Sequence, residues 1–162
     1  MGVDATSPSS VHRLPIPTYD GGQLPHTQPE RLIDNRKQSA TGGGKVQARL
    51  LRFGSIEVEG RQYDNDIVID GGQVRKRKKK PSKSYRDQFG HTPLSADEEL
   101  PWGGDQLIIG TGANGSLPIM PEVLDEARRR GIDLTAVPTE HACRLIASLE
   151  QGEVHAVLHV TC

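Results

Sequence analysis

The hydrophobic positions between residues 46 and 77 follow the pattern of short β-strands. Ile56 and Val58 alternate with Glu57 and Glu59, as in a strand with one buried face. Two more strands are expected on either side of the Asp-Gly-Gly turn signal at residues 70–72. We therefore predict antiparallel, hairpin-like strands in this part of the chain. Their apolar positions are Leu51, Phe53, Ile56, Val58, Ile67, Val68, Ile69 and Val74.

Two amphipathic helices are predicted in the second half of the chain. Pro121 suits a first helical position, and Gly131 is a natural C-terminal stop. The next helix is expected to take Thr139 as its N-cap and to end before Gly152. The apolar faces of these helices are Val123, Leu124 and Ala127 in the first and Ala142, Leu145, Ile146 and Leu149 in the second.

Strands are predicted around both helices. Residues 107–109 are apolar without alternation, which is typical of a strand buried on both faces. Residues 132–137 and 154–160 are expected to form the following strands. The order strand, helix, strand, helix, strand places helices over a largely parallel sheet. Together with the earlier antiparallel strands, this predicts an α/β domain with a mixed central sheet and a C-terminal βαβαβ unit.

A further short helix is predicted at residues 96–100. Ser95 and Glu98 have the spacing of a capping box, in which each side chain bonds the backbone N–H of the other residue. The acidic residues that follow Ser95 also suit the positive end of a helix dipole.

Residues 1–45 differ in composition from the rest of the chain. They are rich in Ser, Thr, Gly, Gln and Pro, and cannot bury enough apolar surface to offset the entropy of ordering. We predict a disordered N-terminal tail at 1–45 and a folded domain at 46–162. The first six residues match the loose myristoylation pattern at Gly2, and a plain terminus is the alternative.

Charge and cysteine content narrow the class of protein. The formal net charge is -1, so no global field favours nucleic acid or a membrane surface. No apolar run approaches the roughly 20 residues of a membrane span, and no secretory signal core is present. Cys143 and Cys162 fit no metal or redox spacing. We expect a reducing, cytoplasmic compartment and no membrane partner.

A basic run at residues 75–83 contains seven basic residues in nine. One interpretation is a solvated strand end and loop whose lysines protect a sheet edge. The alternatives are a nuclear signal or a phosphate-binding patch. No aromatic residue interleaves with the run, so we favour the first interpretation and do not predict a nucleic-acid partner.

Several stretches in order resemble the Mth-domain family, a domain of unknown function. They are residues 90–95 (GHTPLS), 107–112 (LIIGTG), 117–118 (LP), 130–133 (RGID), 138–140 (PTE) and the closing run 151–162. The family's relatives include an adipogenesis-associated protein and a mitochondrial factor that assists assembly of respiratory complex I. The resemblance implies a three-layer α/β fold in which one strand of the sheet runs antiparallel to the rest. It implies no enzyme activity.

The loop from Gly110 to Gly115 is the best candidate for a ligand site. It spells G-x-G-x-x-G after a strand, but the following helix begins only near Pro121, too late to face a dinucleotide. A small anion or polar ligand fits better, and a tight structural turn is the alternative. We expect Gly112 to have positive φ, or to lie against a ligand or neighbouring backbone. The candidate ligand-binding residues are His91, Thr92, Ser95, Gly110, Thr111, Gly112 and Asn114.

No complete catalytic or metal-binding set is predicted. No acid is placed in the sequence to orient His91, and a hydrogen-bonded loop histidine is the favoured interpretation. His155 and His159 share a strand face but are roughly 13 Å apart, too far for one metal. Cys143 is expected to be a buried thiol, and the role of Cys162 stays open. We predict no cofactor, no metal and no catalytic residue.

Two functions follow as hypotheses. The first is a non-catalytic binding or assembly module with a protein partner, which rests on the family resemblance. The second is a small-ligand enzyme or sensor that uses the Gly110–Gly115 loop and His91. Nucleic-acid binding through the basic run is a weaker third.

Overall fold

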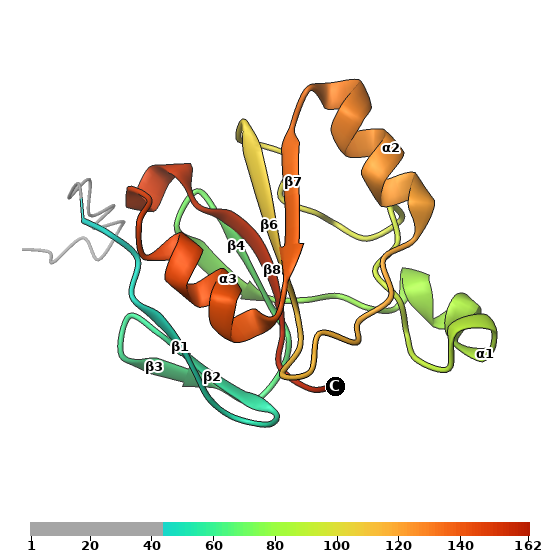
Figure 1. Cartoon of the computed structure of the whole chain (residues 1–162), viewed down its shortest axis with the longest axis horizontal. Coiled ribbons are helices and arrows are strands. Elements are labelled where there is room, and N and C mark those ends of the chain that lie inside the picture. The colour runs from blue at the N-terminus through green and yellow to red at the C-terminus, as the bar shows by residue number, and fades with distance from the viewer. Residues whose placement is uncertain (1–43) are drawn as a thin grey trace, which may run out of the picture. The chain divides into compact units, whose positions relative to one another are not determined.

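The computed structural model describes residues 44–162, and the predicted tail with its acylation motif lies outside this range except for its last two residues (Figure 1). Lys45, the last residue of the predicted tail, already forms a backbone β-bridge with Glu150. The elements in chain order are β1 (Ala48–Arg52), β2 (Ser55–Val58), β3 (Arg61–Tyr63), β4 (Ile67–Asp70), β5 (Gln73–Lys76), the 3-10 helix η1 (Pro81–Tyr85), α1 (Arg86–Phe89), β6 (Gln106–Thr111), α2 (Pro121–Arg130), β7 (Asp133–Val137), α3 (Thr139–Ile146), the 3-10 helix η2 (Gln151–Glu153) and β8 (His155–His159).

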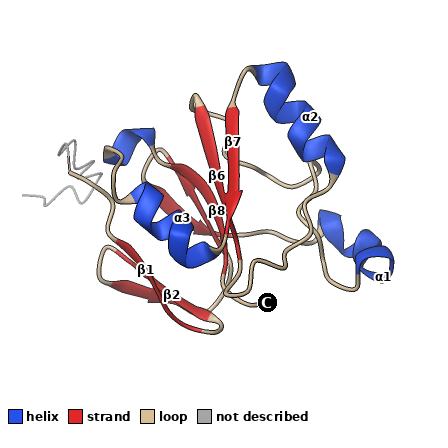
Figure 2. Ribbon diagram, in the orientation of Figure 1, coloured by secondary structure: helices blue, strands red, loops and turns tan. Residues whose placement is uncertain are grey.

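A five-stranded sheet with the order β5-β4-β8-β6-β7 forms the centre of the domain (Figure 2). β6 pairs in parallel with both β7 and β8, whereas β4 pairs antiparallel with both β5 and β8. β4 therefore runs against the other four strands. The predicted α/β fold with a mixed sheet and one antiparallel strand is confirmed.

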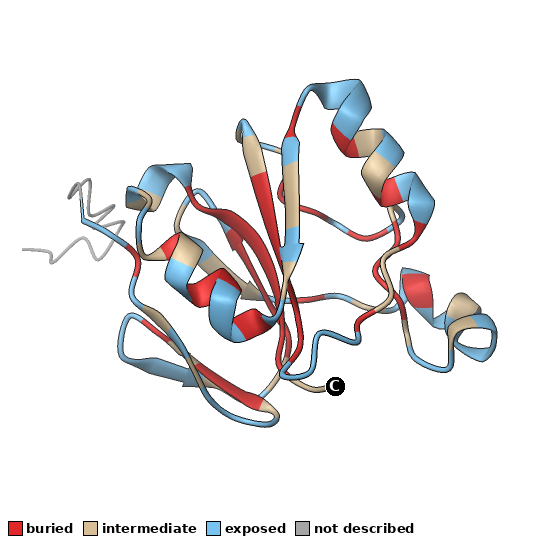
Figure 3. Cartoon of the chain, in the orientation of Figure 1, coloured by how far each residue is buried: buried red, intermediate tan, exposed pale blue. Residues whose placement is uncertain are grey.

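The central sheet separates two hydrophobic cores, because side chains of successive strand residues point to opposite faces. Ile108 packs in the core under α3, and its neighbours Leu107 and Ile109 pack in the core under α2. β4, β6 and β8 are buried along most of their length (Figure 3). The prediction that residues 107–109 form a strand buried on both faces is confirmed.

The first three strands form their own antiparallel sheet, with the order β1-β2-β3. Ile56 and Val58 of β2 are buried in the core under α3, as the alternation predicts. Leu51 is exposed because Leu50 takes the inward position of β1 and its neighbour must face solvent. Phe53 is exposed in the turn between β1 and β2. The hairpin tip is attached to the end of β8 by a 2.6 Å hydrogen bond from the Gly54 N–H to the Val160 carbonyl oxygen.

The two predicted helices in the second half are present, but α3 ends at Ile146, so Leu149 lies in the turn that follows and Gly152 does not stop the helix. α2 begins at Pro121 and ends at Arg130, and its C-cap Gly131 takes the left-handed conformation with φ +70°. α3 buries Ala142 and Ile146. The prediction of Thr139 as N-cap of α3 is wrong: Pro138 holds that position, and Thr139 is the first, buried residue of the helix. Its hydroxyl is used elsewhere, as described below.

The short helix predicted at residues 96–100 is absent, because that segment forms turns. The spacing of Ser95 and Glu98 fits a capping box, but both side chains bond to residues far away in the sequence. Helical structure instead occurs earlier, in η1 and α1. Among the described helices, none has the length and apolar character to cross a membrane.

Candidate functional site

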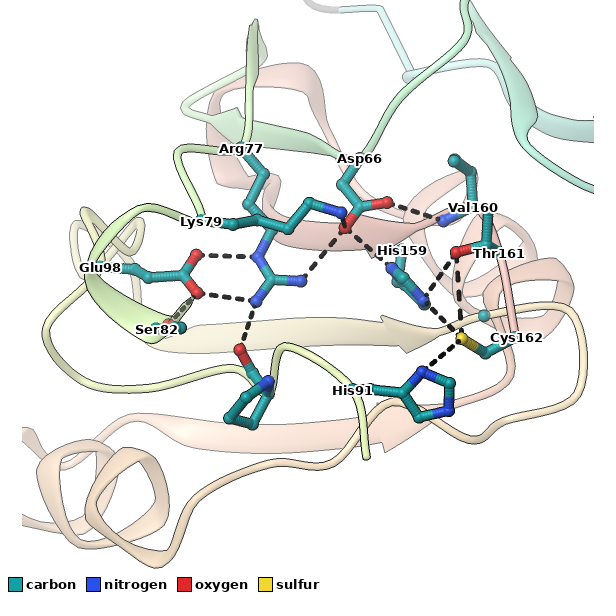
Figure 4. Close-up of polar contacts among 12 residues, drawn as sticks. Asp66, Arg77, Lys79, Ser82, His91, Glu98, His159, Val160, Thr161 and Cys162 are labelled. Atoms are coloured by element: carbon teal, nitrogen blue, oxygen red, sulfur yellow. Dashed lines mark hydrogen bonds and ion pairs between the residues drawn. The ribbon is translucent and has the colours of Figure 1, made fainter. Parts of the chain in front are cut away.

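Three charged side chains form a buried ion-pair cluster near the strand ends (Figure 4). Asp66 precedes β4, Arg77 follows β5, and Glu98 lies in the loop before β6. Arg77, whose side chain is 1% exposed, donates from Nε and Nη2 to the two carboxylate oxygens of Glu98 at 2.8 and 2.7 Å. It also donates to Asp66 Oδ2 at 3.1 Å and to the Pro93 carbonyl oxygen at 2.8 Å. Because buried charges are stable only when paired, this cluster holds three separate segments together.

Asp66 has further partners besides Arg77. Its Oδ1 accepts the Val160 N–H at 3.2 Å, and its Oδ2 contacts Lys79 Nζ at 2.9 Å and His159 Nδ1 at 2.8 Å. Burial alone would raise the pKa of this carboxyl group, but the hydrogen bond and charge of His159, with those of Lys79, outweigh burial. The pKa of Asp66 is therefore held well below its usual range, and the group is an ionised acceptor.

His159 connects Asp66 to a thiol. Since the ionised carboxylate can only accept, Nδ1 of His159 carries a hydrogen, so Nε2 is the nitrogen that can accept a proton whenever the ring is neutral. Nε2 lies 3.3 Å from Cys162 Sγ and 3.1 Å from Thr161 Oγ1. On its other side, Cys162 Sγ lies 3.7 Å from Nδ1 of His91. A carboxylate, an imidazole and a thiol thus follow one another, with a second imidazole beside the thiol (Figure 4).

The glycine-rich loop holds the segment that carries this thiol. The Ala113 N–H donates to the Thr161 carbonyl oxygen at 3.3 Å, and the Asn114 N–H donates to the Cys162 carbonyl oxygen at 2.7 Å. The loop does present backbone donors, as its composition suggested. In this structure those donors bind the chain's own carbonyl groups.

The hydroxyl of Thr139 joins the same loop to β8. It accepts the Gly112 N–H at 2.9 Å and donates to the His159 carbonyl oxygen at 2.5 Å. A Cβ at Gly110 would lie 2.8 Å from this hydroxyl oxygen. Glycine is therefore needed at Gly110 because α3 begins directly against it.

Gly112 has both properties that its place in the sequence predicts. Its φ is +102°, and a Cβ there would overlap the Thr161 carbonyl oxygen and lie 2.5 Å from that of Cys162. The prediction of positive φ or close backbone approach is confirmed on both counts. Here the neighbouring backbone is residues 161–162.

The seven predicted ligand-binding residues lie in different environments. Ser95 is buried and shares a hydrogen bond with Ser82, which in turn bonds Glu98 of the ion-pair cluster. Thr111 donates its hydroxyl to a carbonyl oxygen of β7. His91 and Asn114 are exposed, and both contact Cys162. Thr92 is half-buried, and the two remaining residues are the glycines described above. Ligand binding by this set stays a prediction.

The sequence analysis missed Asp66 and His159 as site residues. His159 was considered only as a metal ligand together with His155. The spacing of His159 and Cys162 at a strand end was a usable signal, because three residues there bring the side chains within contact distance. Asp66 gave no local signal, since its partners are more than ten residues away along the chain.

The basic run at residues 75–83 belongs largely to ion pairs. Arg77 and Lys79 pair with buried Asp66, and two further cations of the run pair with exposed Glu99. β5, where the run begins, is an edge strand of the central sheet. The run is thus a strand end and loop with four of its seven cations in ion pairs, and the absence of a nucleic-acid partner stays a prediction.

A second histidine–carboxylate pair lies at the other end of β8. His155 Nδ1 is 3.0 Å from Asp70 Oδ1, beside a surface hollow lined by Gly103, Gly104, Asp105, Gln106, Gly152, Glu153 and His155. No thiol is within contact of this imidazole. Within residues 44–162, no group of three or more His, Cys, Asp or Glu side chains has the arrangement of a metal site.

Comparison with known families identifies the chain. Residues 49–159 match the family described as "Protein of unknown function (DUF498/DUF598)". The chain belongs to this family. The narrower Mth-domain name, which the motifs suggested, stays a prediction.

Two solved structures resemble this DUF498/DUF598 protein. A conserved hypothetical protein from Pyrococcus horikoshii OT3 is 28% identical, with a TM-score of 0.56 over 71% of this chain and 98% of that one. An outer membrane protein from Bartonella henselae is 17% identical, with a TM-score of 0.51 over 74% of this chain and 98% of that one. At 17% identity the second likeness supports the fold alone.

Proposed function

We propose that this DUF498/DUF598 protein is a binding or assembly module for a protein partner, and that it docks through the tip of the β1–β2 hairpin. The observation that carries the proposal is the exposure of Phe53, whose relative accessibility is 64%. Leu51, two residues before it, is 38% exposed. Aromatic side chains are enriched at protein interfaces, where they fill pockets on the partner.

The fold does not require an aromatic side chain at this position. The hairpin tip is held by the backbone bond from Gly54 to Val160 and by the buried β2 residues Ile56 and Val58. Phe53 therefore contributes little to the stability of the free domain. In a complex, its burial would contribute about 1.5–3 kcal/mol of favourable transfer free energy.

The expected partner surface is an apolar pocket with an acidic rim. Arg52, adjacent to Phe53, is also exposed and is the cation that an acidic rim would face, whereas Arg49 on the same strand is 69% exposed but pairs with Glu57 at 3.2 Å. A separate observation concerns the compartment in which the module acts. Both cysteines of the chain are free thiols. We accordingly place this module in a reducing compartment, the cytoplasm.

The proposal is tested by comparing tagged full-length wild type with Phe53→Ser and with a control, Glu122→Ser, on the exposed surface of α2. We expect at least one protein to be retained by the wild type and the control but lost with Phe53→Ser. The purified candidate should then bind Phe53→Ser about 10- to 100-fold more weakly than wild type. The unfolding free energy of both variants should stay within about 0.5 kcal/mol of wild type.

Two results would contradict the docking surface. If Phe53→Ser retains the same proteins with the same affinity, the hairpin tip does not dock. If size-exclusion chromatography finds that the wild type self-associates and Phe53→Ser does not, the occupant is a second copy of this chain rather than another protein.

A further inference from the structure

The line of Asp66, His159 and Cys162 has the geometry of an activated thiol. The imidazole Nε2 lies 3.3 Å from Sγ, and its Nδ1 lies 2.8 Å from a carboxylate that is 2% exposed. Such an arrangement fixes the tautomer in which Nε2 can accept a proton from sulfur. Cys162 is only partly buried, unlike Cys143, which is buried.

We propose that Cys162 is a nucleophilic thiol that forms mixed disulfides with low-molecular-weight disulfides, with His159 as its base and Asp66 as the positioning residue. His159 Nε2 takes the proton from Sγ as the sulfur attacks one sulfur of the disulfide. The S–S bond of the substrate breaks, and a new S–S bond to Cys162 forms. The departing thiolate then takes the proton from Nε2 and leaves as a thiol. The Cys162 sulfur is oxidised and the departing sulfur is reduced, so the disulfide is itself the oxidant and no further one is needed.

The loop geometry favours a disulfide over an acyl group as the electrophile. Acyl transfer develops negative charge on a carbonyl oxygen and needs free N–H donors to stabilise it. The neighbouring N–H groups of Gly112, Ala113 and Asn114 already bind oxygens of the chain itself. In thiol–disulfide exchange the charge leaves on sulfur, and no such donors are required.

The reaction should stop at the mixed disulfide. The chain has one other cysteine, Cys143 on α3, which is 4% exposed within the core. Burial raises the pKa of the Cys143 thiol to about 11, so this thiol is protonated at neutral pH. It cannot approach Cys162 without leaving the core. Release of the bound group therefore requires a second thiol from solution.

The test uses the full chain with Cys143→Ala, so that Cys162 is the single thiol. Oxidised glutathione at neutral pH, with a chelator present, should add one glutathionyl group that excess dithiothreitol removes, as followed by intact mass. The rate constant of native Cys162 should exceed that of the same chain unfolded in urea by about tenfold to 10²-fold. A small thiol in the same urea solution corrects for solvent effects on the reagent.

Two matched variants separate the base from a structural histidine. His159→Gln should lower the native rate constant by about tenfold or more, because the amide cannot take the proton. His155→Gln removes the other buried imidazole of β8, which contacts no thiol, and should leave the rate unchanged. Cys162→Ser in the wild-type background should abolish the adduct of the folded protein.

Three outcomes would overturn the proposal. One is a rate constant for the reaction of Cys162 with oxidised glutathione that is no greater in the native chain than in the unfolded chain. This comparison needs no histidine variant. Another is an unchanged rate in His159→Gln with native circular dichroism. The third is equal loss of rate in the His155 and His159 variants, which would indicate a general effect of buried histidines on folding.

Discussion

Replacing Arg77 by Met should destabilise the protein by about 3–4 kcal/mol. Arg77 makes two bonds to Glu98, one to Asp66 and one to the Pro93 carbonyl oxygen. Asp66 would keep Lys79 and His159, but Glu98 would lose its only cation among the described ion pairs while its side chain stays 2% exposed. Breaking a buried ion pair from one side costs about 3–5 kcal/mol, because one charge is left uncompensated.

Urea unfolding of the full chain measures this loss. With a slope of about 1.5 kcal/mol/M, the midpoint should fall by roughly 2 M. Lys78→Met, in the same basic run, is the matched control: Lys78 and its partner Glu99 are both mostly exposed, so the loss should be below about 1 kcal/mol. A loss below about 1 kcal/mol for Arg77→Met would refute the assignment of Arg77 to a buried cluster.

A second variant tests the reason for the loss. Adding Glu98→Met to Arg77→Met removes the uncompensated carboxylate, and apolar replacement of a whole buried pair is often neutral or stabilising. The double variant should therefore be at least about 1 kcal/mol more stable than Arg77→Met alone. If the double variant is instead less stable than Arg77→Met alone, the cost comes from lost packing and not from an unpaired charge.

Three further predictions concern the glycine-rich loop, the inner face of α3 and the pH dependence of Asp66. Gly112→Ala should lower the melting temperature and the protease resistance of residues 161–162, because its Cβ would overlap backbone oxygens there. Ile146→Ala should cost about 2–5 kcal/mol and Leu145→Ala less, by urea unfolding, because Leu145 is only half-buried. A loss for Leu145→Ala equal to that for Ile146→Ala would contradict the inner face of α3. Asp66 has a depressed folded-state pKa, so its contribution is present above about pH 4 and is lost as pH falls through the lower folded value. In Asp66→Asn, the unfolding free energy should therefore fall less steeply with pH below about pH 5 than it does in the wild type. The control Glu99→Gln, at an exposed site, should change this pH dependence much less. Equal pH dependence in Asp66→Asn and wild type would contradict the role of Asp66.

The periodic parts of the fold could be predicted from the sequence because their cause is local. β6 and α2 each bury residues at the spacing that their own geometry sets, and Pro121 and Gly131 mark the ends of α2 by backbone conformation alone. The same reasoning recognised Gly112, since positive φ is a property of a single residue. None of these features depends on a partner distant in the chain.

The two wrong capping predictions occur where a residue distant in the sequence binds the side chain that was expected to cap a helix. Ser95 and Glu98 have capping-box spacing, but the guanidinium of Arg77, 21 residues away from Glu98, takes the glutamate carboxylate. Thr139 could cap α3, but its hydroxyl bonds β8 and the glycine-rich loop instead. A single sequence does not reveal these competitors, because the folded sheet brings them together.

The two histidine–carboxylate pairs of β8 explain why the candidate chemistry lies at one end of the strand. Both imidazoles are buried and both bind an aspartate through Nδ1. Asp70 is 46% exposed, whereas Asp66 is 2% exposed and fixed by Arg77. A carboxylate held by several partners orients its histidine firmly, and only His159 then has a thiol within reach of Nε2. The buried ion-pair cluster therefore stabilises the domain and also fixes the imidazole that faces Cys162, so loss of Arg77 should slow the thiol as well as weaken the fold.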